Sequence, residues 1–118
     1  MSVENNFRID YVEFPAASVA ATKRFYTRIF GWKFEDYGPD YASFQDGRLS
    51  GGFSTSDGAG KTGPVVIVYA SDLIAAEASI KAAGGVIVKE ASDFPGGRGF
   101  HFSDPSGNVL GVWSDAAS

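Results

Sequence analysis

The chain has 118 residues, of which 44% are hydrophobic and 20% charged, a composition typical of one globular domain with its own core. Its net charge of -4 argues against a nucleic-acid-binding protein, because such proteins need a basic surface to meet phosphate. The absence of cysteine excludes disulfides, thiolate metal sites and a thiol nucleophile. The first ten residues do not resemble a signal peptide, and no apolar run approaches the roughly 20 residues that span a bilayer, so we expect a cytoplasmic protein that does not bind membranes.

The first half of the chain predicts a strand, a helix and three further strands. The alternation over residues 7–15 suits a strand, with Tyr11 and Glu13 on one side. Ser18 can cap a helix through its hydroxyl, and Gly31 suits the left-handed position after the last turn. The predicted elements are a strand at 7–15, a helix over 19–30, and strands at 32–38, 41–45 and 48–54, the last two joined by an Asp46-Gly47 hairpin.

The second half repeats this order. Asp72 can cap a helix that ends at Gly84 and Gly85, and a second hairpin turn is predicted between Asp104 and Gly107. Residues 91–99, ASDFPGGRG, are predicted to be a flexible connection. The remaining predicted elements are a strand at 65–70, a helix over 73–83, and strands at 86–91, 100–103 and 108–113.

The repeated order predicts a duplicated unit. Placing Tyr11 over Val65 aligns the first strands and helices of the two halves, and Gly51 later falls on Gly111. We therefore predict a single α+β domain of two βαβββ modules, about 7–54 and 65–114, joined by a small polar linker at 55–64. Paired side by side, the modules would form a curved eight-stranded mixed sheet, with helices outside and a concave cleft of the kind that binds small molecules.

Two stretches carry a resemblance to a known family. YVEFPAASVAATKRFYTRIFGWKFE resembles the opening strand and helix of the glyoxalase / bleomycin-resistance / extradiol dioxygenase superfamily, also called the vicinal oxygen chelate fold. GGRGFHFSDPSGNVLGVWS is similar to the closing Asp-Pro-x-Gly-Asn hairpin of that superfamily. The likeness covers residues 7–114. It implies two βαβββ modules around a cleft that holds a small-molecule ligand, and often a homodimer.

The resemblance also locates four metal-ligand positions, a His early in the first strand of each module and a Glu in the last. These positions correspond to Tyr11, Gly51, Val65 and Gly111. Valine and glycine have no side-chain donor, and a phenol is a poor substitute for imidazole, so we expect neither a metal site nor a cofactor. Tyr11 is expected to fill the place of a ligand histidine, and the two glycines to enlarge the cleft.

His101 and Glu13 are the candidate catalytic residues. Phe100 and Phe102 are expected to face the helix, which turns His101 towards the cleft, where an imidazole with a pKa near ~6.5 can transfer protons. His101 can equally be a polar residue on a solvated sheet face. Glu13 can act as a base or bind a cationic group, or remain a solvated charge.

The other candidates are ligand-binding residues. Arg98, in the glycine-rich connection, could clasp a carboxylate or phosphate, or simply be exposed. Trp113 shares a face with Val109 and Gly111, and either stacks on a planar ligand or packs against the sheet. The complete set expected to line the cleft is Tyr11, Ser43, Gly51, Val65, Ile67, Arg98, Val109, Gly111 and Trp113.

Three functions are compatible with these features. The first is a metal-free protein that binds a metabolite or an antibiotic. The second is a lyase, isomerase or ring-cleaving oxygenase that uses Glu13 and His101 in an atypical metal site or in metal-free acid–base chemistry. The third is an interaction subunit whose concave face binds no metabolite. Gly60-Lys61-Thr62 resembles the end of a phosphate-binding loop, but the glycine required five residues earlier is Thr55, so we interpret it as linker.

Overall fold

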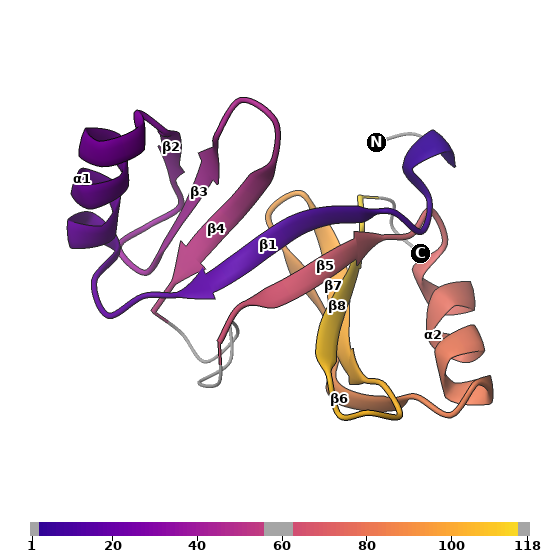
Figure 1. Cartoon of the computed structure of the whole chain (residues 1–118). Coiled ribbons are helices and arrows are strands. Elements are labelled where there is room, and N and C mark those ends of the chain that lie inside the picture. Colours follow the sequence, from indigo (N-terminus) through magenta and orange to yellow (C-terminus); the bar gives the residue numbers. More distant parts are fainter. Residues whose placement is uncertain (1–2, 56–62, 116–118) are drawn as a thin grey trace. The chain divides into compact units, whose positions relative to one another are not determined.

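The computed structural model describes residues 3–55 and 63–115 (Figure 1). The linker segment 56–62, which contains Gly60-Lys61-Thr62, lies outside the described residues. Two compact units divide the chain: one runs from Tyr11 to Val65, and the other combines the N-terminal residues up to Asp10 with the chain from Val66 onward. No helix in the described ranges is long and apolar enough to cross a membrane.

The order of elements confirms the predicted repeat, strand–helix–three strands, in each half. The described strands belong to one mixed sheet with the order β2-β3-β4-β1-β5-β8-β7-β6, which confirms the α+β class. Strands β1 and β4, and likewise β5 and β8, are parallel, whereas the remaining partners within each half are antiparallel. The bounds are β1 Ile9–Pro15, α1 Val19–Phe30, β2 Lys33–Asp36, β3 Tyr41–Gln45, β4 Ser50–Ser54, β5 Val65–Tyr69, α2 Leu73–Ala82, β6 Val86–Phe94, β7 Gly97–Ser103 and β8 Val109–Ser114, after a short 3-10 helix at Val3–Asn5.

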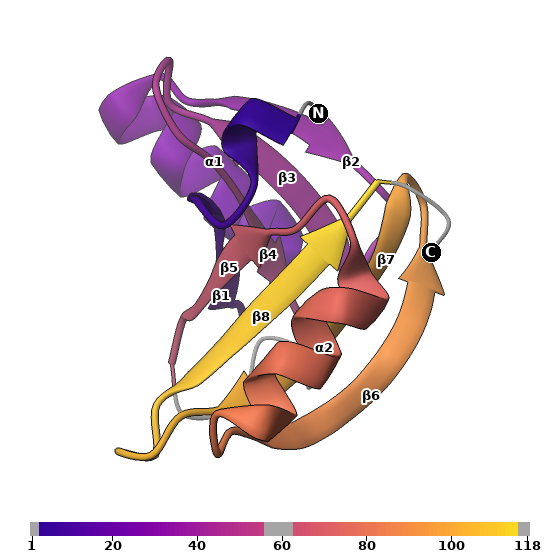
Figure 2. The ribbon, with the colours of Figure 1, turned by 90° about the vertical axis from the view of Figure 1, so that its right-hand side faces the viewer.

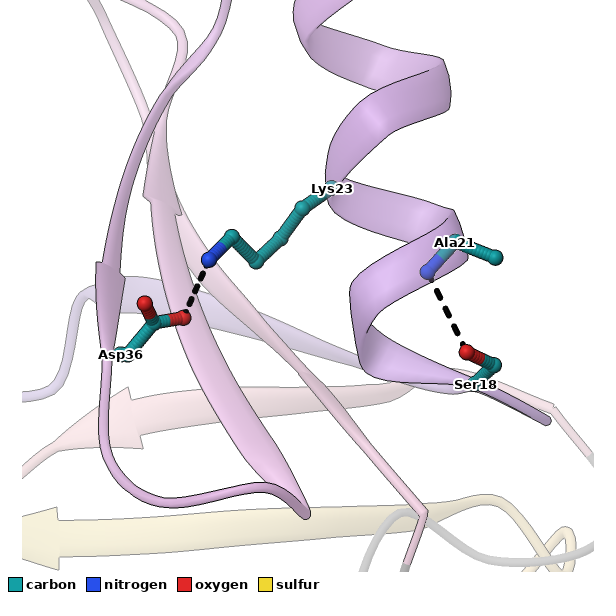
Figure 3. Close-up of polar contacts among 4 residues, drawn as sticks. All are labelled: Ser18, Ala21, Lys23 and Asp36. Atoms are coloured by element: carbon teal, nitrogen blue, oxygen red, sulfur yellow. Dashed lines mark hydrogen bonds and ion pairs between the residues drawn. The ribbon is translucent and has the colours of Figure 1, made fainter.

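Helix α1 begins and ends as its sequence predicts. The Ser18 hydroxyl accepts a hydrogen bond from the Ala21 N–H at 3.2 Å, which satisfies a backbone donor at the start of the helix (Figure 3). Gly31, with φ 71°, closes the last turn by donating to the Thr27 carbonyl at 3.0 Å. Lys23 forms an ion pair with Asp36 at 2.6 Å, which joins the helix to β2 (Figure 3).

An aromatic core lies between α1 and one face of β1–β4. The ring centroids of Trp32 and Phe44 are 4.6 Å apart, and those of Tyr26 and Phe53 are 5.3 Å apart. Phe14 of β1 stacks on Phe53 at 5.4 Å, so alternate residues of β1 face α1 as the sequence predicts. Most of the aromatic residues of this module therefore form core, and the opposite face is left to Tyr11, Glu13 and their neighbours.

Helix α2 lies across one face of β6, β7 and β8 (Figure 2). The Asp72 carboxylate accepts from the Ala75 N–H at 3.0 Å and caps the helix, as predicted. Leu73 and Phe100 are 2% and 1% exposed, at the centre of a core completed by Ala70, Ala76 and Val112. Phe102 packs against this cluster, which confirms that Phe100 and Phe102 face the helix.

The N-terminal segment pairs with β5. The Phe7 N–H donates to the Tyr69 carbonyl at 2.7 Å, and the Tyr69 N–H donates to the Arg8 carbonyl at 3.0 Å. The Ser71 N–H donates to the Asn6 side chain at 2.8 Å. These bonds join residues 6–8 to the unit that contains α2.

The two hairpin turns use the same chemistry. The Asp46 carboxylate accepts from the backbone N–H groups of Arg48 and Leu49 at 2.8 and 2.6 Å. The Asp104 carboxylate accepts from Ser106 and Asn108 N–H groups, both at 2.9 Å. Both predicted turns are confirmed, and each aspartate holds its loop in a turn that mimics backbone hydrogen bonding.

The prediction for residues 91–99 is wrong. Strand β6 continues to Phe94, the chain turns over two residues, and β7 begins at Gly97. Asp93 lies opposite Arg98, and their side chains form an ion pair at 2.9 Å. The glycines and the proline suggested a loop, but antiparallel pairing with β6 supplies the hydrogen bonds that keep this glycine-rich stretch extended.

Candidate functional site

A row of residues crosses the first module on the face opposite α1. Ser43 of β3 lies opposite Gly52 of β4, which also lies beside Glu13 of β1. Tyr11 and Tyr41 are on the same face, because each is two residues from a member of this row. The register thus gathers two phenols and a carboxylate around a residue without a side chain.

The hydroxyl oxygens of Tyr11 and Tyr41 are hydrogen-bonded at 2.5 Å. A Cβ atom added at Gly52 would collide with the Tyr41 hydroxyl and would lie 2.6 Å from the Tyr11 hydroxyl. The hydroxyl pair therefore occupies the space beside Gly52 that any side chain at that position would need. We call Tyr11, Tyr41 and Glu13 the tyrosine–glutamate cluster.

Both phenols of the cluster are held in the protonated state. Burial raises the pKa of Tyr11 to about 12, and the negative charge of Glu13 adds to this effect against the opposing hydrogen bond from Tyr41. Burial also raises the pKa of Tyr41, and the charge of Glu13 and hydrogen bonding to Tyr11 and Glu13 act in the same direction. At neutral pH the cluster combines two neutral hydroxyls with one carboxylate.

Gly51 and Gly52 face opposite sides of the sheet. A Cβ at Gly51 would collide with the Phe44 ring in the α1 core, so Gly51 does not share the face of Tyr11. The neighbour on that face is Gly52, one residue later. The alignment of Gly51 with Gly111 is therefore shifted by one residue, because sequence spacing alone does not fix strand register.

An equivalent row crosses the second module on the face opposite α2. Gly111 of β8 lies between Ile67 of β5 and His101 of β7, and Lys89 of β6 lies opposite His101. A Cβ at Gly111 would lie 3.1 Å from His101 Cδ2 and 3.2 Å from Ile67 Cγ1. Gly111 thus takes the place in its module that Gly52 takes in the first.

His101 is half-buried on this face. Burial lowers the pKa of its imidazole, and the nearby charge of Lys89 lowers it further. His101 is therefore mainly neutral at pH 7, a form in which one ring nitrogen donates and the other accepts. The imidazole can serve as a proton acceptor or as a hydrogen-bonding group towards a ligand.

Trp113 is anchored within its own unit. Its indole N–H donates to the Asp10 carboxylate at 2.9 Å, and its ring lies edge-to-face on Tyr69 with centroids 5.4 Å apart. A Cβ at Gly97 would lie 3.0 Å from Trp113 Cε3, so the ring covers that glycine. These contacts give Trp113 a packing role, whatever a ligand adds.

The remaining predicted residues lie at strand ends. Arg98 lies in β7, one residue after Gly97, and is paired with Asp93 rather than free on a loop. Val65 is the first residue of β5 and is 4% exposed. Val109, the first residue of β8, is 42% exposed.

Sequence reasoning missed three residues on these two faces: Tyr41, Gly52 and Lys89. The signal for Tyr41 was present, because alternation within β3 places Tyr41 and Ser43 on one face. Gly52 and Lys89 could be assigned to these faces only once the strand register was known. The pairing of β6 with β7 shifts on both sides of Lys89, which no sequence periodicity reports.

The donor set does not fit a divalent metal of the kind that the resemblance implies. The corrected positions in the first module hold Tyr11, a protonated phenol engaged with Tyr41, and Gly52, which has no donor. In β5 and β8 they hold Val65 and Gly111. Across residues 3–55 and 63–115, no three His, Cys, Asp or Glu side chains come together as a ligand group.

The family model of the Glyoxalase/Bleomycin resistance protein/Dioxygenase superfamily matches residues 8–112. The chain belongs to this superfamily. The match spans both modules, so the resemblance drawn from the opening and closing motifs is confirmed.

Solved structures agree on the fold. The Mn(II)-bound glyoxalase from Novosphingobium aromaticivorans matches with a TM-score of 0.68 and 26% identity, over 96% of this chain but 40% of the other. Methylmalonyl-CoA epimerase from Mycobacterium tuberculosis matches with a TM-score of 0.70 and 16% identity, covering 98% of this chain and 93% of that one. An NAD-dependent benzaldehyde dehydrogenase structure from Legionella pneumophila matches with a TM-score of 0.72 and 15% identity, covering 88% and 96%. A search of curated proteins gave no match.

Proposed function

We propose that this chain is a glyoxalase/bleomycin-resistance-like protein that binds a small molecule without the metal site of the superfamily. The observation that carries the proposal is the pair of equivalent glycines, Gly52 and Gly111, where a metal-using member would present a carboxylate. The hydroxyls of Tyr11 and Tyr41 occupy the space beside Gly52, and the imidazole of His101 lies beside Gly111. Polar groups in partly buried surroundings suit ligand recognition.

The proposal includes a homodimer, which the resemblance implies, and a cytoplasmic location. The candidate ligand-binding residues of the first module are the tyrosine–glutamate cluster and Ser43. The second module, considered by itself, offers Ile67, His101 and Gly111. Light scattering coupled to size exclusion measures the mass in solution. A monomer over a wide concentration range would remove the dimer from the proposal.

The test combines metal analysis with a ligand screen. We expect the purified chain to retain less than a stoichiometric amount of Mn, Fe, Ni or Zn, and its melting temperature to be insensitive to added metal or chelator. A panel of metabolites and antibiotics should contain compounds that raise the melting temperature, because a ligand that binds only the native state stabilises it. Stoichiometric metal that is lost in His101→Ala would contradict the proposal and favour an enzyme with an atypical metal site.

A second candidate function is metal-independent acid–base catalysis, as in a lyase or isomerase. The observation that favours it is the presence of a carboxylate, Glu13, next to two protonated phenols, so that a base and hydrogen-bond donors meet in one cluster. Proton exchange from a carbonyl compound into D2O, followed by NMR, tests it. Exchange that is catalysed by the wild type and abolished in Glu13→Gln would support this candidate over simple binding.

A further inference from the structure

Glu13 is a half-buried carboxylate that forms no ion pair with a basic side chain of residues 3–55 and 63–115. Within the described part of the chain, the ion pairs are Lys23–Asp36, Lys81–Glu77 and Arg98–Asp93, and none includes Glu13. Burial is the main cause that keeps the phenols of Tyr11 and Tyr41 protonated, and the charge of Glu13 acts in the same direction on both. The carboxylate therefore sets a negative potential at the tyrosine–glutamate cluster, and none of the ion pairs found in the described part of the chain neutralises it.

The sign of this potential selects the ligand group. The same field that disfavours a phenolate at Tyr11 or Tyr41 disfavours a bound carboxylate, phosphate or enolate at that place. It favours a positive group, and the Glu13 carboxylate has more lone pairs than one phenol can occupy. The cluster is thus electrostatically complementary to a cation.

The surrounding atoms suit an ammonium group that has protons to donate. The two phenol oxygens lie together beside Gly52 and can accept hydrogen bonds in addition to the one that they share. Tyr37, 49% exposed, packs edge-to-face against Tyr41 with centroids 6.3 Å apart, which adds a third aromatic ring. Aromatic rings attract a nearby cation through their quadrupoles.

We propose that the tyrosine–glutamate cluster binds the protonated amine of an organic ligand, with Glu13 as its counter-ion and the hydroxyls of Tyr11 and Tyr41 as hydrogen-bond acceptors. The inference rests on the proposed small-molecule function and specifies the chemical class of the ligand. It assigns the amine-bearing end of that ligand to the first module.

The test uses three phenyl compounds of similar size and different charge: 2-phenylethylamine, 2-phenylethanol and phenylacetate. At pH 7.5, we expect NMR titration to show saturable shifts of the Gly52 and Tyr41 amides with the amine at millimolar concentration. The alcohol should bind at least fivefold more weakly, and phenylacetate should leave these amides unshifted. Equal binding of amine and alcohol, or binding of phenylacetate at these residues, would overturn the proposal.

Variants locate the counter-ion. Glu13→Gln keeps the size of the side chain and should weaken amine binding at least tenfold. Glu35→Gln removes an exposed carboxylate from the same row, opposite Ser43, and should change binding less than twofold. Tyr41→Phe should weaken amine binding by a factor between those of Glu35→Gln and Glu13→Gln. Circular dichroism and melting curves confirm that each variant folds. Unchanged binding in Glu13→Gln, or no amine binding to wild type, would overturn the inference.

Two further outcomes separate this inference from the function on which it rests. A compound from the ligand panel whose affinity is the same in Glu13→Gln would support small-molecule binding and contradict the amine site. The last probe is Mn2+ alone. If Mn2+ broadens the NMR signals of the cluster only, if Glu13→Gln abolishes this broadening, and if the amine has no effect, the cluster is a metal site. That result would contradict both proposals.

Discussion

Tyr11 and Tyr41 are 30 residues apart in the chain, and their hydroxyl oxygens are 2.5 Å apart. The pair forms because β1 and β3 both lie beside β4, and because Gly52 of β4 has no side chain to separate them. The hydrogen bond therefore depends on a glycine that belongs to neither tyrosine's strand. Several measurable properties of the protein depend on this arrangement.

The first prediction concerns the ionisation of Tyr11. Its pKa is raised from 10.0 to about 12, chiefly by burial. Because the folded state holds this proton more tightly than the unfolded state, its contribution to stability is complete below pH 10 and is lost as the pH rises through 12. The absorbance at 295 nm, compared with that of Tyr11→Phe, reports the titration. A Tyr11 phenol that ionises at its ordinary pKa would show that the side chain is not buried in solution as it is in the structure.

The second prediction compares two glycines. Gly52→Ala should destabilise the protein by roughly 1–3 kcal/mol, as overpacking does, because the new methyl meets the Tyr11 and Tyr41 hydroxyls. Gly111→Ala should cost less, because its nearest neighbours are side-chain atoms of His101 and Ile67 beyond 3 Å. Urea unfolding measures both free energies of unfolding.

The same comparison has an internal control. In the Tyr11→Phe/Tyr41→Phe background both hydroxyls are absent, and Gly52→Ala should cost less than it does in the wild type. An equal cost in the two backgrounds, or a larger cost at Gly111 than at Gly52, would contradict the packing described here. Such non-additivity is expected only for residues in direct contact.

The order of the elements and most of their limits could be predicted from the sequence. The capping roles of Ser18, Asp72 and Gly31 can be predicted from the neighbouring sequence, since each residue bonds within one turn of its own helix. The turn-forming roles of Asp46 and Asp104 are predictable for the same reason, since each carboxylate bonds within its own hairpin. Residues 91–99 were mispredicted for the opposite reason: their extended conformation depends on a partner strand rather than on their own glycines.

The candidate site was only partly predictable, because it depends on register. Alternation correctly placed Tyr11 with Glu13 on one face of β1 and Phe14 on the other. It could not decide between Gly51 and Gly52, since a shift of one residue exchanges the faces of a strand. It also could not find the Tyr11–Tyr41 bond, which requires the neighbours of β4 to be known.

The third prediction concerns His101. Burial and the charge of Lys89 lower its pKa from 6.5. Because the folded state resists protonation, the contribution of His101 to stability is present above pH 6.5 and is lost as the pH falls through its folded pKa. NMR titration of the imidazole Cε1 proton measures the pKa directly, since His101 is the only histidine in the chain.

Lys89→Met tests the cause of that shift. It removes the charge and keeps a chain of similar length, so the pKa of His101 should rise towards its ordinary value while burial still holds it below. Lys81→Met is the matched control, because Lys81 pairs with Glu77 on α2 and does not act on His101. A response to Lys81→Met equal to that of Lys89→Met would assign the effect to net charge rather than to the register of β6 and β7.

The fourth prediction concerns the core under α2. Leu73, 2% exposed, packs in the cluster that contains Phe100 and Val112, so Leu73→Ala should destabilise the protein by about 2–5 kcal/mol through lost burial and the cavity that it leaves. Its neighbour Ile74 is 65% exposed, and Ile74→Ala should cost much less. Chemical unfolding followed by tryptophan fluorescence measures both, since Trp113 lies in the same unit. Similar losses of unfolding free energy in Leu73→Ala and Ile74→Ala would mean that α2 packs on its strands with a different face.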